Sequence, residues 1–413
     1  MSPRTAREPP IVSHKGMHSA KGHGRLAVAL AVVLGLQAAP CCSAFTRLAP
    51  CAAGVNLLRL QCCALSRRQT VLALPGALRL LRRPPAAAQM DAIAASKPVG
   101  YRATTLLVGG QTIPVAQWYP MADEGEEAAT FINTGPPYRY RINIANLFRA
   151  FLGFKPPIPS PEVRNGGASA VRPDASPAQG ESKGGIVFAH GLLGSRFDMA
   201  TLCEQLAREG FVVSSADFAE LISGSFAPNE NTGRGAIIDA EMELLRRDFG
   251  ATTFGIFGHS AGGGSASMAP GPFLLGRCAI AGARPYGGRD PFYIIASAGD
   301  GVIPMDRIRA AVRPDMPVAS HAGQLDWEKS TSGALLINSP VTDGSRYMPS
   351  HISFLDAEAN AALVRVLSPL LPLAKLLRLP TLDFDVYVQR IDAESTAAAV
   401  RPSIIEFFLR RSH

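Results

Sequence analysis

The pattern of apolar and polar positions divides residues 101–412 into short apolar runs separated by segments with helical spacing. Short apolar runs bounded by polar or glycine-rich segments predict buried strands. They lie at 186–189, 211–214, 254–257, 278–281, 292–296 and 334–337. Apolar residues that recur every three to four positions predict helices at 199–208, 237–249 and 305–312. Strands that alternate with helices predict an α/β fold with a mostly parallel central sheet and helices on both faces.

The segment before these strands shows three different patterns. Two runs, 104–108 and 112–119, flank Gly109-Gly110 and predict an N-terminal β-hairpin. Apolar residues within 138–154 recur at helical spacing and predict a helix. Residues 155–184 are rich in Pro, Gly, Ala and Ser, which predicts a flexible insertion within a domain spanning 101–412.

Positive charge is concentrated at the start of the chain. The net charge is +8, but residues 1–90 carry twelve Lys or Arg and one acid, Glu8, so they contribute +11 and the remainder −3. No later stretch combines a basic stripe with interleaved aromatic residues. We therefore expect no nucleic-acid partner.

The basic N-terminal region is typical of two targeting signals in series. In 1–44, basic residues precede an apolar run at 26–39 and the small-x-small sequence Cys42-Ser43-Ala44, which predicts a secretory signal peptide. Residues 45–90 contain seven Arg and no acid, which predicts a transit-peptide-like segment. The junction Ser43-Ala44-Phe45 resembles the bipartite leaders of algae with secondary plastids and implies a plastid location. Arg67-Arg68 resembles a twin-arginine signal for the thylakoid lumen, and the region could instead stay attached as an amphipathic membrane anchor.

Cysteine usage gives no sign of a metal site. Five of the seven cysteines lie in the leader, and the remaining two, Cys203 and Cys278, lie in predicted apolar elements. Their spacing fits no metal motif, so we expect two buried thiols. The sequence implies neither a cofactor nor a metal.

The sequence TTFGIFGHSAGGGSA, residues 252–266, contains a G-x-S-x-G pattern around Ser260. At the end of a predicted strand, this pattern is typical of a nucleophile held on a sharp strand-to-helix turn. A second match surrounds Ser182, but it precedes any strand of the alternating series. We therefore predict that Ser260, and not Ser182, is a nucleophile.

A serine nucleophile requires a histidine base and an orienting carboxylate, which follow it in the chain in one common hydrolase order. His351 follows the last predicted strand, whereas His321 precedes that strand and His413 is the final residue. Asp300 directly follows the strand at 292–296 and precedes a turn, whereas Asp290 follows a glycine-rich loop. We predict His351 as the base and Asp300 as the acid.

The oxyanion of such a reaction is stabilised by backbone amides. The residue after the nucleophile, Ala261, supplies one, and the loop after an early strand supplies the other. In FAHGLLGSR that loop begins at His190-Gly191, which makes the Leu192 amide the second predicted donor. His190 is then expected to hold the loop.

The chain resembles the α/β-hydrolase superfamily over residues 101–412. More narrowly it is similar to the platelet-activating-factor acetylhydrolase and chlorophyllase branch. The resemblance rests on VFAHGLLGSRFDM, LAREGFVVSSADF, FGHSAGGGSA, SHISFLDAE and TTLLVGGQTIPVAQWYP. It implies a Ser260-Asp300-His351 triad with Leu192 and Ala261 as oxyanion donors. Plant chlorophyllases carry an Arg where this chain has Ala261, which counts against chlorophyll as the substrate, whereas the plastid-type leader counts in its favour.

Together these features predict a serine esterase that cleaves an apolar lipid ester through an acyl-serine intermediate. The phytyl ester of chlorophyll is a second possible substrate. The strand-to-helix turn at Ser260 would also suit an acyltransferase, and a non-catalytic hydrolase-like binding protein is a further alternative. Residues 363–379 are strongly apolar and contain two prolines, so they are either a wall of an apolar pocket or a kinked core helix. The basic stretch 138–155 is either a packed helix or a peripheral contact with a membrane surface.

Overall fold

The computed structural model describes the chain from residue 99 to residue 412. The described residues are 99–122, 138–143, 145, 162–165, 171–178, 180, 182–192, 194–218, 229–341, 348–368 and 393–412. The predicted leader segments, 1–44 and 45–90, lie outside them, as does His413. In this part of the chain, no helix is long and apolar enough to cross a membrane.

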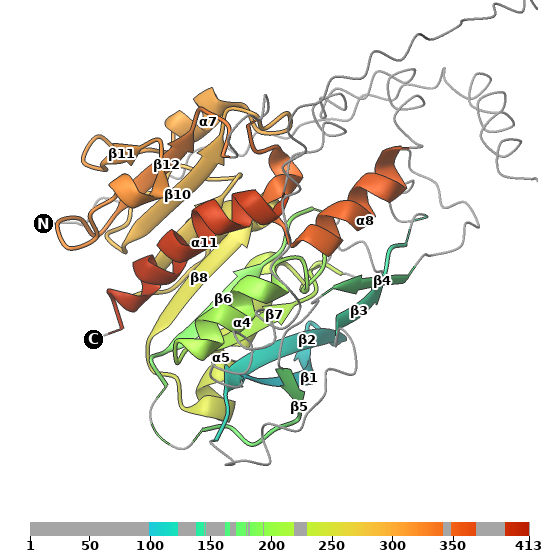
Figure 1. The fold of residues 1–413 in the computed structure, drawn as a ribbon. Helices are drawn as coiled ribbons and strands as arrows, with labels where there is room; N and C mark the ends of the chain where they lie inside the picture. Colours follow the sequence, from blue (N-terminus) through green and yellow to red (C-terminus); the bar gives the residue numbers. More distant parts are fainter. Residues whose placement is uncertain are drawn as a thin grey trace, which may run out of the picture. The chain divides into compact units, whose positions relative to one another are not determined.

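A large sheet runs through the described residues, with the strand order β11-β12-β10-β9-β8-β6-β7-β2-β1-β5 (Figure 1). From β6 to β12 every neighbouring pair is parallel. The parallel strands are β6 (Gly185–Ala189), β7 (Val212–Ala216), β8 (Phe254–His259), β9 (Gly276–Ile280), β10 (Phe292–Ser297), β11 (Val318–Ala319) and β12 (Gly333–Ile337). A mostly parallel sheet is the architecture predicted from the alternating pattern.

An antiparallel hairpin extends the sheet beyond β7. Strands β1 (Val99–Val108) and β2 (Gln111–Pro120) pair along their full length, and β2 pairs antiparallel with β7. Gly109 and Gly110 join the strands with φ of 55° and 76°. Two successive positive φ values are what a tight two-residue hairpin turn requires, and glycine adopts them without a Cβ clash.

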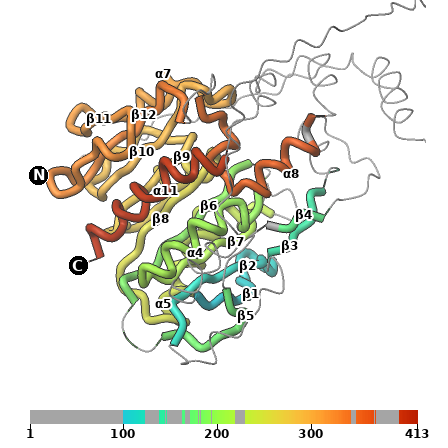
Figure 2. Tube along the Cα trace, viewed as in Figure 1, coloured from blue at the N-terminus to red at the C-terminus, as the bar shows by residue number. Residues whose placement is uncertain are grey.

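Helices cover both faces of the sheet (Figure 2). The alternate side chains of each strand enter different cores: Ile186 and Phe188 of β6 pack in one cluster, and Val187 and Ala189 in another. The first cluster is covered by α4 (Ala200–Arg208), α8 (Ala357–Leu367) and α11 (Ala393–Leu409). The opposite face is covered by α5 (Arg234–Phe249), α6 (Ala261–Met268) and α7 (Met305–Arg309).

Burial on both faces explains why the strands are continuous apolar runs rather than alternating ones. All residues of β6, β7, β8, β9 and β10 are buried. The thiols of Cys203 and Cys278, in α4 and β9, are free and buried, as predicted. Burial raises the pKa of both thiols, so they are held in the protonated form.

The prediction of a helix from residue 138 is wrong at its start. Residues Tyr138–Arg141 form strand β3, which pairs antiparallel with β4 (Glu162–Asn165). The sequence Tyr-Arg-Tyr-Arg alternates, and both tyrosines are buried while both arginines are exposed. The alternating pattern of 138–141 therefore forms a strand, although the apolar residues that follow it have helical spacing. Residues 146–154 of the predicted helix lie outside the described residues.

The segment predicted as a flexible insertion also contains regular structure. Strand β4 lies within it, and β5 (Val171–Pro173) pairs parallel with β1 at the edge of the large sheet. The predicted apolar segment 363–379 is described only to residue 368, where it forms the end of α8.

Candidate active site

Ser260 lies on a strained turn between β8 and α6. Its φ of 57° and ψ of −119° fall in a region that side-chain-bearing residues avoid. The Ser260 amide donates to the Ile280 carbonyl at 2.8 Å, and the Ser260 carbonyl accepts from the Gly264 amide at 3.1 Å. These bonds fix a sharp strand-to-helix elbow at the carboxyl end of the central strand, which is the local structure that the G-x-S-x-G pattern predicts.

The two glycines of the pattern are required by close backbone approach. A Cβ at Gly262 would lie 1.8 Å from the Ala189 carbonyl oxygen, at the end of the neighbouring strand β6. A Cβ at Gly258 would lie 2.2 Å from the Gly262 carbonyl oxygen. No side chain fits at either position without moving the backbone. The elbow therefore needs glycine on both sides of Ser260.

Asp300 and His351 are joined in a buried pair. The Nδ1–H of His351 donates to Oδ2 of Asp300 at 2.8 Å, and the two side chains are 5% and 2% exposed. Oδ1 of Asp300 accepts from the amides of Val302 and Ile303, at 2.7 and 2.9 Å. Asp300 follows β10, and the turn after it fixes both carboxylate oxygens. The carboxylate thus holds the imidazole in one orientation and one tautomer.

His351 begins a short 3₁₀ helix, η3 (His351–Phe354), which follows β12 and returns toward β8. The end of this segment is held by Asp356, whose amide donates to the Asp198 carbonyl at 2.9 Å. The Asp356 carboxylate accepts from the Thr201 amide at 2.9 Å and pairs with Arg401 of α11. The segment 351–356 is therefore attached both to the start of α4 and to α11.

His259 connects the elbow to the segment 351–356. Its Nε2–H donates to the backbone carbonyl of His351 at 2.8 Å, and the two imidazole rings lie 4.8 Å apart. Burial lowers the pKa of His259 to about 3, so it stays neutral at neutral pH. The residue next to Ser260 in the chain thus touches the predicted base. The sequence analysis missed this residue, although its place inside G-x-S-x-G was a usable signal.

The loop after β6 lies against the nucleophile. A Cβ at Gly191 would lie 3.1 Å from the Cβ of Ser260, so this glycine leaves room beside the serine. The Nδ1–H of His190 donates to the Gly191 carbonyl at 2.7 Å, while His190 Nε2 accepts from the Phe218 amide at 2.9 Å. These two hydrogen bonds agree with the expected role of His190, which is to hold this loop in place. Of the two predicted oxyanion donors, Leu192 follows Gly191 in this loop and Ala261 is the first residue of α6.

The residues that the sequence analysis set aside make contacts elsewhere. His321 is exposed at the start of a short 3₁₀ helix, and Ser182 lies just before β6 rather than at the carboxyl end of a strand of the parallel series. Asp290 forms an ion pair with Arg277 at 2.8 Å.

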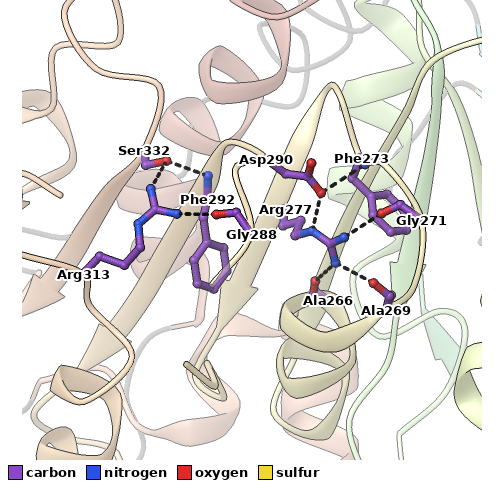
Figure 3. Close-up of polar contacts among 10 residues, drawn as sticks. All are labelled: Ala266, Ala269, Gly271, Phe273, Arg277, Gly288, Asp290, Phe292, Arg313 and Ser332. Atoms are coloured by element: carbon purple, nitrogen blue, oxygen red, sulfur yellow. Dashed lines mark hydrogen bonds and ion pairs between the residues drawn. The ribbon is translucent and has the colours of Figure 1, made fainter. Parts of the chain in front are cut away.

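Arg277 fixes the far end of the helix that carries the nucleophile (Figure 3). Its side chain, 3% exposed, donates to the carbonyls of Ala266, Ala269 and Gly271, and its Nε–H donates to Asp290. The carbonyls at the C-terminal end of a helix lack partners within it. One guanidinium therefore binds the end of α6 to β9.

Two carboxyl groups of the core, those of Asp198 and Glu241, are fully buried and have raised pKa values. Burial raises the pKa of Asp198, whose Oδ2 accepts from the Ser195 amide, to about 8. Burial also raises the pKa of Glu241 to about 8, where Ser214 donates to one carboxyl oxygen. Desolvation disfavours the charged form, so both groups bind a proton at neutral pH. In the described part of the chain, no cluster of three His, Cys, Asp or Glu residues has the geometry of a metal site.

The chain matches no protein-family model, and no curated protein matches it significantly. Solved structures do resemble it. A ferulic acid esterase from Streptomyces cinnamoneus aligns at 18% identity and a TM-score of 0.44, over 77% of this chain and 92% of that one. An a/b serine hydrolase without lid, XC6422 from Xanthomonas campestris, aligns at 12% identity and a TM-score of 0.34, over 66% and 95%. A putative dienelactone hydrolase from Klebsiella pneumoniae subsp. pneumoniae aligns at 14% and 0.33, over 65% and 97%.

These similarities are distant, so the fold is assigned from the arrangement of the chain's own strands and helices. A mostly parallel sheet, helices on both faces and a strained serine between a central strand and a helix are the features of the α/β-hydrolase fold. The acid and the histidine follow the serine in the chain order of that fold.

Proposed function

We propose that this protein is a serine carboxylic-ester hydrolase. The observation that carries the proposal is the buried Asp300–His351 hydrogen bond at the carboxyl edge of the sheet, in contact with the residue that precedes Ser260. A strained serine and a fixed imidazole at one edge are the parts that nucleophilic acyl transfer requires.

In the proposed reaction, Oγ of Ser260 attacks the ester carbonyl while Nε2 of His351 takes the hydroxyl proton. The tetrahedral oxyanion accepts from the amides of Leu192 and Ala261. Collapse of the intermediate breaks the bond to the alcohol, which leaves with the proton from His351. A water molecule then attacks the acyl-serine by the same steps and releases the acid. Asp300 orients the imidazole and stabilises its charged form.

For the substrate we propose an apolar lipid ester. The resemblance to the platelet-activating-factor acetylhydrolase branch supports this class, and so does the Leu192 side chain, which is 53% exposed on the loop beside Ser260. The phytyl ester of chlorophyll is the second candidate, favoured by the plastid-type composition of residues 1–90. Acyl transfer and non-catalytic binding are the candidate functions outside hydrolysis.

The test is hydrolysis of a panel of esters by the purified protein and by its Ser260→Ala variant. The panel contains short-chain phospholipids, p-nitrophenyl esters and chlorophyll, and added alcohols report acyl transfer. We expect release of acid from an apolar ester by the parent protein and a loss of about 10⁴-fold or more in the variant. Equal activity of the two proteins would refute the proposal, and an ester product formed from the added alcohol would identify an acyltransferase.

We also propose that residues 1–90 direct the protein to a plastid by the secretory route, with the thylakoid lumen as the second candidate destination. The support is the signal-peptide pattern of 1–44 followed by the acid-free, Arg-containing segment 45–90. A fluorescent protein fused behind residues 1–90 is expected in the organelle, and a cytosolic fusion would contradict the proposal.

A further inference from the structure

An arginine from α5 is bound to the loop that carries the predicted oxyanion donor. Arg234 is the first residue of α5 and follows β7 in the chain, whereas His190 and Gly191 precede β7. Its Nη1 donates to the His190 carbonyl at 2.8 Å, and its Nη2 lies 3.5 Å from the Gly191 carbonyl oxygen. One planar guanidinium therefore spans two successive carbonyl groups of the loop, a geometry that suits its fixed fork of donors.

The Gly191 carbonyl belongs to the same peptide unit as the Leu192 amide. In a trans peptide the C=O and the N–H point in opposite directions, so whatever fixes the carbonyl also fixes the amide. The Gly191 carbonyl receives the Nδ1–H of His190 at 2.7 Å and the Gly194 amide at 3.1 Å, with the Arg234 guanidinium at 3.5 Å. Positive charge near the carbonyl also polarises the peptide unit and strengthens the amide as a donor.

Arg234 lies at the end of α5 where the helix dipole disfavours a cation. The start of a helix carries partial positive charge, which disfavours a cation in the first turn. Gly233, before Arg234, provides no side-chain cap. The guanidinium instead stacks on the Phe218 ring, 4.5 Å from its centre, and the Phe218 amide donates to His190. Phe218 thus supports both side chains that hold the loop.

We propose that Arg234 is a positioning residue for the oxyanion hole: it orients and polarises the peptide unit whose amide, that of Leu192, stabilises the transition state. This inference rests on the proposed esterase function. A residue with this effect acts on the transition state more than on the bound substrate, because the oxyanion exists only after attack. Substitution of Arg234 is therefore expected to lower kcat and the affinity for analogues of the tetrahedral state.

The test compares the parent protein with Arg234→Ala, Arg234→Lys and a control on the same helix, Arg247→Ala. Arg247 is 67% exposed and forms an ion pair with its chain neighbour Asp248. Each protein is assayed with a soluble p-nitrophenyl ester, with an aryl trifluoromethyl ketone as a tetrahedral-state inhibitor, and for its melting temperature. Guanidinium chloride at millimolar concentration is added to each assay.

We expect Arg234→Ala to lower kcat about 10- to 100-fold, because removal of a whole oxyanion donor costs about 10²- to 10³-fold. KM is expected to stay within threefold, inhibition by the ketone to weaken by the same factor as kcat, and guanidinium to restore part of kcat. Arg234→Lys, with one point charge in place of a fork, is expected between the parent and Arg234→Ala. Arg247→Ala is expected to match the parent protein.

Three results would overturn the inference. The first is a kcat of Arg234→Ala within twofold of the parent. The second is a loss that lies in KM and leaves inhibition by the ketone unchanged. The third applies if Arg234→Ala does not fold: a folded Arg234→Lys variant equal to the parent in kcat and in ketone inhibition. A parent protein without Ser260-dependent esterase activity would instead refute the proposed function, and this inference with it.

Discussion

The close approach of Gly282 to the backbone of Ser260 predicts a large effect from a small substitution, Gly282→Ala. Gly282 follows β9, whose last residue, Ile280, accepts the hydrogen bond from the Ser260 amide. A Cβ at Gly282 would lie 1.9 Å from the Ser260 carbonyl oxygen and 2.6 Å from its carbonyl carbon. All three nearest atoms belong to the backbone of Ser260, so no side chain can rotate away to make room.

The size of the effect follows from that distance. An acceptable carbon–oxygen contact needs about 3.3 Å, so the backbone of Ser260 or of residue 282 must move by about 1.4 Å. A misplacement of about 1 Å in a catalytic group costs roughly 100-fold in rate. Overpacking of a buried site costs about 1–3 kcal/mol of unfolding free energy. We therefore expect kcat to fall by about 100-fold or more in a protein that still folds.

Gly287→Ala is the matched control, because it lies in the same loop and a Cβ there would meet no atom within 4 Å. The assay measures kcat with a p-nitrophenyl ester and the free energy of unfolding by urea for both variants and the parent. Gly287→Ala is expected to equal the parent. A Gly282→Ala variant that keeps kcat within threefold would refute the reasoning, because the elbow would then not depend on its backbone contact with the segment after β9.

Three further predictions concern the acid, the arginine behind α6 and a buried carboxyl group. Asp300→Asn removes the carboxylate that accepts from Nδ1 of His351, so kcat is expected to fall about 10³- to 10⁴-fold with little change in unfolding free energy; a tenfold loss or less would contradict it. Arg277→Met leaves three carbonyls and Asp290 without their donor and is expected to cost about 3–5 kcal/mol in urea unfolding, whereas an unchanged midpoint would be contrary to this account. Burial raises the pKa of Glu241 from 4.5 to about 8, so the stability from its proton is complete below pH 4.5 and is lost as pH rises to 8. Relative to Glu241→Gln, the parent should therefore lose about 1.4 kcal/mol per pH unit between pH 5 and 8, and parallel stability curves would exclude a buried protonated carboxyl.

The sequence was sufficient for the central sheet because its strands are buried on both faces. A strand with both faces covered is a short continuous apolar run, and such runs identify β6, β8, β9, β10 and β12 to within a few residues. The order of strands and helices along the chain then predicts which loops meet at one edge of a parallel sheet. Asp300 and His351 could be paired on that basis, although 51 residues separate them.

The segments that the sequence analysis misjudged are short or lie at the edges of the sheet. Strand β3 has only four residues, and its alternation was masked by the helical spacing of the apolar residues that follow it. Strands β4 and β5 lie in a Pro- and Gly-rich stretch whose composition is typical of loops. These strands are specified by pairing with distant partners, which leaves little trace in the local sequence.

The residues that support the site were missed for a related reason. His259, Arg234 and Asp356 act through contacts with backbone atoms of segments far away in the chain. An arginine at the start of a helix or an aspartate after a short 3₁₀ helix has no motif that marks it. His259 was within reach of sequence reasoning because of its position; Arg234 and Asp356 needed the three-dimensional arrangement.

The central claim is that Ser260 forms the acyl intermediate of an ester hydrolase. The most direct measurement is to stop the reaction with a p-nitrophenyl ester during turnover and to map the acyl group by peptide mass spectrometry. The account predicts an acyl group on the peptide that contains Ser260, absent from the Ser260→Ala variant and removed by hydroxylamine. An acyl group on Ser182, or turnover by the Ser260→Ala variant at the rate of the parent protein, would contradict it.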